Sequence, residues 1–283
     1  MGVKKFAVVG GDFRNKRLVE LLKDKGYEVK SFGLGDMGSA SLDMAVKDVD
    51  FIITSIPFSN DAKTLNTPLC ESNVLLSDFF KAIPKGAVVI GGKIDDNINE
   101  FARCFNIHVV DILKRDDFAI LNAIPTAEGA IGIALKETFV TLNDENIIVL
   151  GYGRIGKVLC SMLKGLGANV CVVSRNPSHN AYAKAFGIKV IDYDLLKISL
   201  ANTKVIFNTV PAKILDKEVL SIMPKDVLVI DLASKPGGVD FEEAKKIGIR
   251  TVWALSLPGK VAPETSATII RDTILNVLKE MGG

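Results

Sequence analysis

The chain has few of the residues that build metal sites and disulfide frameworks. It contains four cysteines and two histidines among 283 residues. The cysteines are Cys70, Cys104, Cys160 and Cys171. They form no CxxC pair, so we expect free thiols in a reducing compartment rather than a zinc site or disulfides. His108 and His179 are interpreted as solvated or hydrogen-bonded side chains, and the sequence therefore predicts no metal.

An excess of charge of one sign is also missing. The chain has 35 Lys and Arg against 33 Asp and Glu, which gives a net charge of +2 at pH 7. We therefore expect no nucleic-acid partner. No stretch approaches the ~18 consecutive apolar residues of a membrane helix, and no apolar leader follows Met1–Lys5. No membrane partner and a cytoplasmic location are predicted.

What the chain does contain is short apolar runs alternating with helical patterns. The expected strands are Phe6–Val9, Val29–Phe32, Phe51–Ser55, Ala87–Ile90, Ile107–Val110, Ile147–Leu150, Val170–Val173, Lys189–Ile191, Val205–Thr209, Val227–Asp231 and Ile249–Trp253. Their apolar residues are continuous, as in strands covered by helices on both faces. This order predicts an α/β fold with two doubly wound parallel sheets. Two domains also suit the length, at roughly 150 residues each.

A glycine motif follows the strand Ile147–Leu150. It reads Gly151-Tyr152-Gly153-Arg154-Ile155-Gly156 and opens an amphipathic helix. In such a motif the first glycine permits a tight turn and the second lets the backbone approach a pyrophosphate. The third lets helix and strand pack closely, and the helix N-terminus attracts the phosphate charge. These six residues predict a dinucleotide site.

The end of the next strand distinguishes the two nicotinamide dinucleotides. A site for NAD commonly has Asp or Glu about 20 residues past the first glycine, where it binds the ribose 2′-hydroxyl. This chain has Ser174 and Arg175 there and no acid before Asp192. The pattern favours NADP, with NAD as the alternative. The other interpretation of Arg175 is a solvated loop residue.

The two halves are expected to form separate Rossmann-like domains. Residues 125–263 are predicted to bind NADP, and residues 1–124 with a C-terminal helix at 264–283 to form a flavodoxin-like substrate or catalytic domain. Two helices are expected to join the halves. One begins after Pro125 with Thr126 as its N-cap; the other begins near Pro263 and packs back on the first domain. We expect a ligand cleft between the domains.

The first strand of the chain is followed by Gly10-Gly11-Asp12, which lacks the third glycine of a dinucleotide motif. A second dinucleotide site is therefore not expected there. Asp12 and Arg14 would still lie at the carboxyl end of a strand, and we predict that they contact a substrate. Asp12 is equally well interpreted as the N-cap of the next helix.

Several segments resemble known dehydrogenase families. The segments Asn208–Pro211, Asp231–Gly238 and Leu257–Thr265 are similar to the cofactor domains of alanine dehydrogenase and the D-2-hydroxyacid dehydrogenases. A closer resemblance, to the dipicolinate synthase A subunits of spore-forming bacteria, covers nearly the whole chain. It is carried by Val9–Arg14, Arg115–Gly129, Asp231–Phe241 and Leu257–Thr265.

The resemblance implies oxidation of a dihydrodipicolinate-type ring, or its hydrated precursor, to dipicolinate, in a branch of lysine biosynthesis. It implies NADP as the acceptor, partnership with a flavoprotein-like B subunit, and action in the mother cell during sporulation. It also implies further cofactor contacts at Asn208, Thr209, Val210, Pro211, Asp231, Ala233 and Ser234. A homo-oligomer is expected from this class of enzyme.

A ring with two carboxylates needs cations or N–H groups to bind it. The cationic candidates are Arg14, Arg115, Lys235 and Lys260. The catalytic candidates are Arg115, Asp116, Asp117, Lys235 and Glu128, and Asn122 and Thr126 complete the expected substrate contacts. Because Arg115, Asp116 and Asp117 directly follow a strand, they are also interpreted as solvated or helix-capping charges. Lys235 would lie near the nicotinamide or be solvated. Glu128 would act as a base or only favour the helix dipole.

The segment Leu257–Val261 departs from the hydroxyacid dehydrogenases because it contains no histidine. In those enzymes a histidine exchanges the alcohol proton, whereas an aromatising dehydrogenation has no such requirement. Two other functions remain open. One is a 2-hydroxyacid or alanine-type dehydrogenase, and the other is a non-catalytic protein that senses NADP for a partner.

Overall fold

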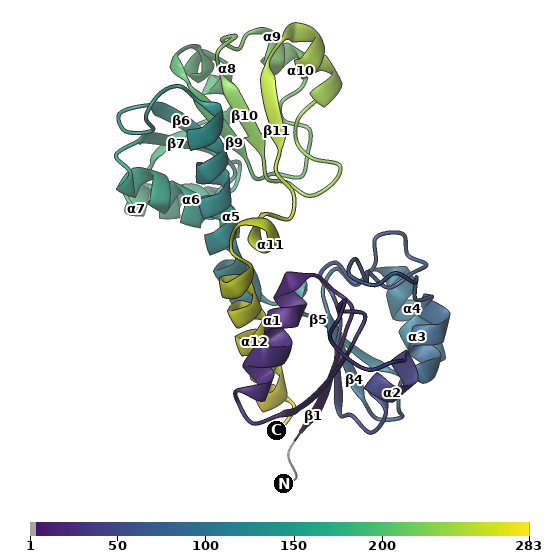
Figure 1. Ribbon diagram of the computed structural model, residues 1–283. Coiled ribbons are helices and arrows are strands. Elements are labelled where there is room, and N and C mark those ends of the chain that lie inside the picture. Colours follow the sequence, from purple (N-terminus) through teal and green to yellow (C-terminus); the bar gives the residue numbers. More distant parts are fainter. Residues whose placement is uncertain (1–3, 283) are drawn as a thin grey trace. The chain divides into compact units, whose positions relative to one another are not determined.

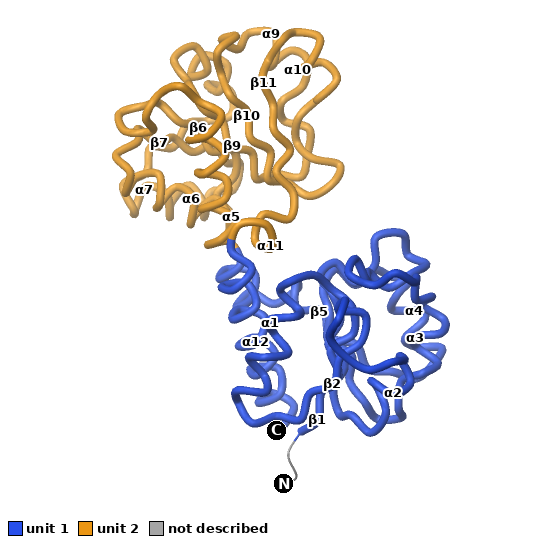
Figure 2. Tube along the Cα trace, viewed as in Figure 1, with its two compact units in different colours: residues 1–122, 262–283 blue, residues 123–261 orange. Residues whose placement is uncertain are grey.

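The computed structural model describes residues 4–282 and divides them into two compact units (Figure 2). Unit 1 consists of the chain up to Asn122 and from Ala262 onward, and unit 2 is Ala123–Val261. The boundaries predicted from the sequence lie two residues further along the chain, at 124/125 and 263/264. Unit 1 is thus assembled from two separate parts of the chain.

The sheet of unit 1 has five parallel strands in the order β2-β1-β3-β4-β5. The strands are β1 (Lys5–Val9), β2 (Glu28–Phe32), β3 (Phe51–Ile53), β4 (Val88–Gly91) and β5 (His108–Asp111). This is the flavodoxin-like order, whose ligand crevice lies where the strand order reverses, between β1 and β3.

Helices cover both faces of this sheet (Figure 1). They are α1 (Phe13–Lys23), α2 (Leu42–Val46), α3 (Leu76–Ala82), α4 (Asp96–Cys104), the 3-10 turn η1 (Ile112–Lys114), the start of α5 (Asp116–Glu137) and α12 (Pro263–Glu280). Leu18 of α1 and Ile270 and Ile274 of α12 share one buried cluster with Phe6 of β1. The helices α2, α3 and α4 bury their apolar residues against the other face. The C-terminal helix therefore packs on the first unit, as predicted.

Unit 2 has a six-stranded parallel sheet in the order β11-β10-β9-β6-β7-β8. The strands are β6 (Asn146–Leu150), β7 (Asn169–Val173), β8 (Lys189–Ile191), β9 (Val205–Asn208), β10 (Leu228–Asp231) and β11 (Arg250–Trp253). This is the order of the dinucleotide-binding Rossmann fold, with the switch point between β6 and β9.

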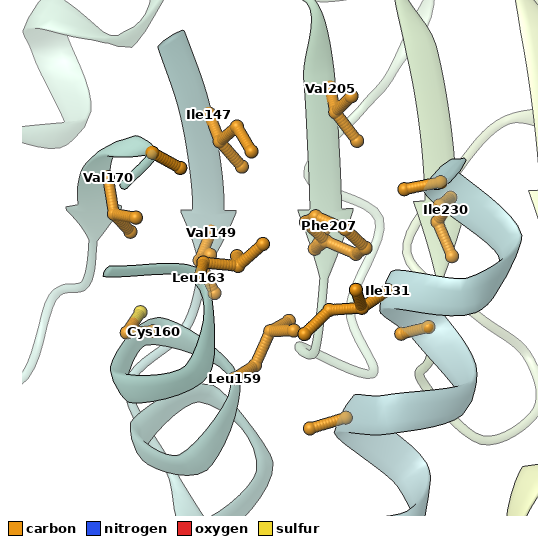
Figure 3. Packing of buried hydrophobic residues seen from close by; sticks show 14 of the residues in the cluster. Ile131, Ile147, Val149, Leu159, Cys160, Leu163, Val170, Val205, Phe207 and Ile230 are labelled. Atoms are coloured by element: carbon orange, nitrogen blue, oxygen red, sulfur yellow. The ribbon is translucent and has the colours of Figure 1, made fainter. Parts of the chain in front are cut away.

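The helical segments of unit 2 also lie on both faces. They are α6 (Arg154–Gly165), α7 (Pro177–Ala185), η2 (Tyr193–Leu195), α8 (Leu196–Ser199), η3 (Leu200–Asn202), α9 (Lys217–Ser221), α10 (Phe241–Ile247) and α11 (Leu257–Val261). One face is covered by α5, α6 and α7, and Figure 3 shows Leu159 of α6 and Ile131 of α5 meeting beside Phe207 of β9. The other face is covered by α8, α9 and α10.

All eleven predicted strands are present, each within two residues of its expected ends. Every strand pair is parallel. The predicted fold class, two doubly wound parallel sheets, is confirmed.

The start of the long helix α5 was predicted wrongly. The helix begins at Asp116 and contains Pro125 in its interior, so Thr126 is not an N-cap. An internal proline removes one backbone hydrogen bond and costs about 3 kcal/mol or more. Burial offsets this cost, because Ala123, Ala127 and Ala130 are each no more than 1% exposed. The helix is continuous because its small apolar face is buried.

This helix also corrects the expectation that no stretch could span a membrane. By length and composition α5 is apolar enough, with a mean hydropathy of 1.5 over its most apolar window. Half of that window is buried within the protein. Ala127, Ala130 and Ala134 of α5 belong to the core cluster of unit 2, so packing accounts for the apolar composition of this part of the helix.

Candidate cofactor and substrate sites

The glycine motif forms a tight turn at the carboxyl end of β6. Gly151 has φ +92°, a left-handed conformation that glycine adopts without strain. Its N–H donates to the carbonyl oxygen of Val173 at 2.9 Å. A Cβ at Gly151 would lie 2.5 Å from Thr209 Oγ1. The turn therefore requires glycine at this position.

The other two glycines differ in their surroundings. A Cβ at Gly156 would lie 2.3 Å from the carbonyl oxygen of Gly151, so α6 could not approach β6 as closely with any other residue. A Cβ at Gly153, the N-cap of α6, would have no atom within 4 Å. No side chain caps this helix end. An anion can therefore approach the backbone N–H groups at the start of α6.

A pocket of about 300 Å³ adjoins this turn. It is lined by Gly151, Tyr152, Gly153, Val173, Ser174, Arg175, Asn176, His179, Tyr193, Thr209, Val210, Pro211 and Ile214. Polar side chains from the end of β7 face apolar ones that follow β9. None of these lining residues carries a carboxylate. The glycine turn, the uncapped helix and this pocket fit the pyrophosphate and adenosine parts of a nicotinamide dinucleotide.

Not every predicted cofactor residue lines the pocket. The lining includes Gly151, Tyr152, Gly153, Ser174, Arg175, Thr209, Val210 and Pro211 of the predicted set. Arg154, Ile155 and Gly156 form the first turn of α6, and Ala233 and Ser234 follow β10 outside the lining.

Asn208 and Asp231 are fully buried and serve the loops instead. The carboxylate of Asp231 accepts hydrogen bonds from Asn208 Nδ2 at 2.7 Å, Ala233 N at 3.0 Å and Gly238 N at 2.8 Å. Asn208 Oδ1 accepts from Val210 N at 3.1 Å. These bonds fix the segments after β9 and β10, and we assign both residues this positioning role rather than the predicted cofactor contact.

Sequence reasoning missed five lining residues: Val173, Asn176, His179, Tyr193 and Ile214. Asn176 could have been found, because Asn followed by Pro is a common start of a helix. Its Oδ1 does accept from Ser178 N and His179 N. Tyr193 and Ile214 come from loops whose path has no sequence signal.

In unit 1, Asp12 and Arg14 lie at the predicted strand end and form an ion pair. Arg14 Nε donates to Asp12 Oδ1 at 2.9 Å, and Arg14 Nη2 donates to Asp12 Oδ2 at 2.9 Å and to the Ile56 carbonyl at 2.8 Å. Asp12 is also the N-cap of α1 and accepts from Arg14 N. Arg14 is 8% exposed. Both interpretations of Asp12 are thus compatible with the structure.

The turn before Asp12 is covered by the protein's own chain. Gly11 N donates to the carbonyl oxygen of Asn66 at 3.1 Å. A Cβ at Gly10 would lie 2.7 Å from Thr67 Cγ2. The loop containing Asn66 and Thr67 thus lies where a pyrophosphate would approach a Rossmann turn, so this turn is not built for a dinucleotide.

Arg115 and Asp117 are bound to each other and to α12. Arg115 Nε and Nη2 donate to the two carboxylate oxygens of Asp117, each at 2.9 Å. Arg115 Nη1 and Nη2 also donate to Glu280 at 2.6 and 2.7 Å. The guanidinium lowers the pKa of Asp117 to about 2 and also lowers the pKa of Glu280. We assign this pair to holding α12. The occupied guanidinium of Arg115 and the low pKa of Asp117 argue against the predicted catalytic role.

The remaining predicted residues lie on α5 or in loops of unit 2. Asp116 is exposed in the first turn of α5, where the helix dipole favours a carboxylate. Asn122, Thr126 and Glu128 lie in the middle of α5 rather than at its start, and only Glu128 of these three is exposed. Lys235 and Lys260 are exposed. Among residues 4–282, no three His, Cys, Asp or Glu side chains are grouped to hold a metal ion.

Two family models match the chain. The model of the N-terminal domain of the dipicolinate synthase A subunit matches residues 5–113. The model of the NAD binding domain of D-isomer specific 2-hydroxyacid dehydrogenases matches residues 127–239, which contain the glycine turn and the pocket. The second match supports a nicotinamide cofactor and an oxidoreductase.

Relatives extend this similarity over the whole chain. The dipicolinate synthase A subunit of Bacillus subtilis (strain 168) is 32% identical over 286 aligned positions, covering 98% of this chain and 96% of the relative. The crystal structure of the A chain of dipicolinate synthase from Bacillus subtilis has a TM-score of 0.90, 32% identity and coverage of 100% of this chain and 98% of that chain. The crystal structure of the A subunit from Bacillus halodurans has a TM-score of 0.89, 32% identity and coverage of 98% and 99%. The chain therefore belongs to the family of dipicolinate synthase A subunits, as its sequence resemblance predicted.

Proposed function

We propose that this protein oxidises a dihydrodipicolinate-type ring, or its hydrated precursor after loss of water, to dipicolinate with NADP as the acceptor. The observation that carries the proposal is the pocket at the glycine turn, in a chain of this family. There Ser174 and Arg175 stand where an NAD site would have an acid. The nicotinamide would accept a hydride from one ring carbon.

The residues of unit 2 bind and orient the cofactor. The open backbone at Gly153 and the uncapped start of α6 hold the pyrophosphate. Ser174 and Arg175 bind the 2′-phosphate. Thr209 Oγ1 donates to the Leu150 carbonyl at 2.8 Å, which fixes the segment Thr209–Pro211 as the facing wall. Lys235 and Lys260 are the proposed cations of this unit for a substrate carboxylate, and Glu128 is the proposed base.

In unit 1 the proposed carboxylate-binding residue is Arg14. Its Nε and Nη2 are held by Asp12 and the Ile56 carbonyl, whereas its Nη1 makes no hydrogen bond to any described residue. A guanidinium that is already oriented loses little entropy when it binds a carboxylate. Asn122 and Thr126 of α5 are further proposed substrate contacts. Aromatisation supplies driving force, so these residues mainly need to orient the ring and accept one proton.

Membership of the family supports a proposal for the partners and the setting. We propose that the chain works with a flavoprotein-like B subunit on a homo-oligomeric core, in the mother-cell cytoplasm during sporulation. The name of the family supports the existence of a second kind of chain in the enzyme, since its members are called A subunits.

A second candidate function is a 2-hydroxyacid dehydrogenase. The match of residues 127–239 to the NAD-binding domain of those enzymes favours it. The segment Leu257–Val261 opposes it, because it contains no histidine to exchange the alcohol proton. A non-catalytic, NADP-sensing protein is the third function that the test must separate.

The test is an absorbance assay at 340 nm with freshly prepared dihydrodipicolinate precursor. The protein is assayed with NADP and with NAD, with and without the B subunit, and dipicolinate is measured by chromatography. We expect NADP reduction together with dipicolinate formation, and its loss in Arg14→Met but not in Lys245→Gln, an exposed residue of α10. Bound NADP without turnover under any of these conditions would favour the sensing protein, and turnover of 2-hydroxyacids would favour the second candidate.

A further inference from the structure

We infer that His179 is a specificity-determining residue, which binds the 2′-phosphate of NADP together with Arg175. This inference rests on the proposed use of NADP and extends it to a residue outside the glycine motif. His179 lines the same pocket as Ser174, Arg175 and Asn176, although sequence analysis gave it no role.

The position of His179 is set by the start of α7. Asn176 is the N-cap of this helix, and its Oδ1 accepts hydrogen bonds from Ser178 N at 2.9 Å and His179 N at 3.2 Å. His179 therefore lies in the first turn of α7 and lines the pocket. His179 is half-buried.

The loop that carries Ser174 and Arg175 is attached to the same helix. Asn180 Nδ2 donates to the Ser174 carbonyl at 3.0 Å, and Asn176 N donates to Ser174 Oγ at 3.2 Å. The guanidinium of Arg175 lies 5.9 Å from the centre of the Tyr193 ring. Ser174, Arg175 and His179 thus lie on one wall of the pocket, at the end of β7. This is the place where a Rossmann fold binds the substituent at the ribose 2′-position.

The charge of the ligand exceeds that of Arg175 alone. A phosphate monoester carries about −1.5 to −2 at pH 7. Among the residues that line the pocket, Arg175 is the only Lys or Arg, and none is Asp or Glu. His179 is the other lining side chain that can be a cation, and even the neutral ring donates one N–H. NAD has a hydroxyl in place of the phosphate and gains little from this second donor.

The test compares the affinities of NADP+ and NAD+ for the intact protein by calorimetry. His179→Ala is expected to raise the Kd of NADP+ roughly 10-fold, as for loss of a charge-assisted hydrogen bond, and to change the Kd of NAD+ less than twofold. The fragments 2′,5′-ADP and 5′-AMP should show the same contrast. His179→Arg should restore the preference, and His108→Ala, on β5 of unit 1, should change neither Kd.

Two results would overturn the inference, and they are distinguishable. If His179→Ala weakens NADP+ and NAD+ equally, His179 only supports the pocket, while the NADP assignment stands. If the unmodified protein binds NAD+ more tightly than NADP+, the site does not read a 2′-phosphate, and both proposals fail. Thermal unfolding of each variant shows whether a lost affinity reflects a lost fold.

Discussion

The glycines of the α6 turn allow stability and cofactor binding to be separated. We predict that Gly156→Ala lowers the stability of unit 2 and weakens NADP+ binding, whereas Gly153→Ala weakens mainly NADP+ binding. The new Cβ at Gly156 would lie 2.3 Å from the Gly151 carbonyl oxygen, so α6 must retreat by at least 0.7 Å to restore a 3.0 Å contact. Overpacking of this kind costs roughly 1–3 kcal/mol, and alanine returns at most about 1 kcal/mol through its helix propensity.

We therefore expect Gly156→Ala to destabilise unit 2 by about 1–2 kcal/mol and to lower its Tm by a few degrees, at roughly 2–4 °C per kcal/mol. The displaced helix start should also raise the Kd of NADP+ at least ~10-fold, since the N–H groups no longer point at the pyrophosphate. At Gly153 a Cβ meets no protein atom. Gly153→Ala should lower the free energy of unfolding by only about 0.5 kcal/mol, because alanine is a poorer N-cap than glycine. The new methyl group would occupy the path of the pyrophosphate, so the Kd of NADP+ should rise as much as in Gly156→Ala.

The assays are calorimetric unfolding and titration with NADP+. Gly165→Ala is the matched control, because it lies at the end of the same helix with open space at its Cβ. Gly165→Ala should leave the Kd unchanged and should not lower the Tm, since alanine favours the helix and meets no clash there. An unchanged Tm and Kd in Gly156→Ala would refute the argument from close packing. Unchanged affinity in Gly153→Ala would show that the pyrophosphate binds elsewhere.

Three other predictions concern the charged groups. The folded pKa of Asp117, about 2, lies below its ordinary 3.8, so its pairing with Arg115 stabilises the protein above pH ~4 and is lost as the pH falls toward 2. Asp117→Asn should lower the free energy of unfolding at pH 7 by about 1 kcal/mol, a figure discounted for the partial exposure of Asp117. The free energy of unfolding should also depend less on pH between pH 4 and 2 than in the unmodified protein, and an unchanged pH profile would contradict this. Asp231→Asn puts an NH2 group opposite buried N–H donors. Chemical denaturation should therefore show a free energy of unfolding lower by about 1–3 kcal/mol, and a decrease below ~0.5 kcal/mol would contradict the importance of these hydrogen bonds. Arg14→Lys keeps the charge but not the paired geometry with Asp12, so KM for the ring substrate should rise about 10-fold with the Kd of NADP+ unchanged, and an unchanged KM would remove Arg14 from the substrate site.

The strands and the cofactor turn could be read from the sequence because their signals are local. A continuous apolar run such as Ile147–Leu150 is typical of a strand buried on both faces, and it is β6 in the structure. The three glycines fix a backbone path by the absence of side chains. Each inference needed fewer than ten consecutive residues and no knowledge of distant ones.

Features that depend on distant residues or on burial could not be predicted from the sequence. Arg115 was predicted to be a substrate cation or a solvated or capping charge, because its partner Glu280 is 165 residues away. Pro125 was read as the residue before a helix, although burial of Ala123 and Ala127 carries α5 through it. His179 was interpreted as solvated or hydrogen-bonded, and its place in the pocket could not be predicted because the pocket also includes Tyr193 and Ile214, which come from other loops.

The composition of unit 1 from two parts of the chain has a consequence for its synthesis. Residues 123–261 leave the ribosome before α12, so unit 2 can fold while unit 1 still lacks a helix. Until then, the apolar surface of α1 and β1 that α12 covers is exposed, including Leu18, Leu22 and Phe6. The N-terminal unit, although translated first, is therefore completed last, and a stop codon before Pro263 would leave it without the helix that covers this face.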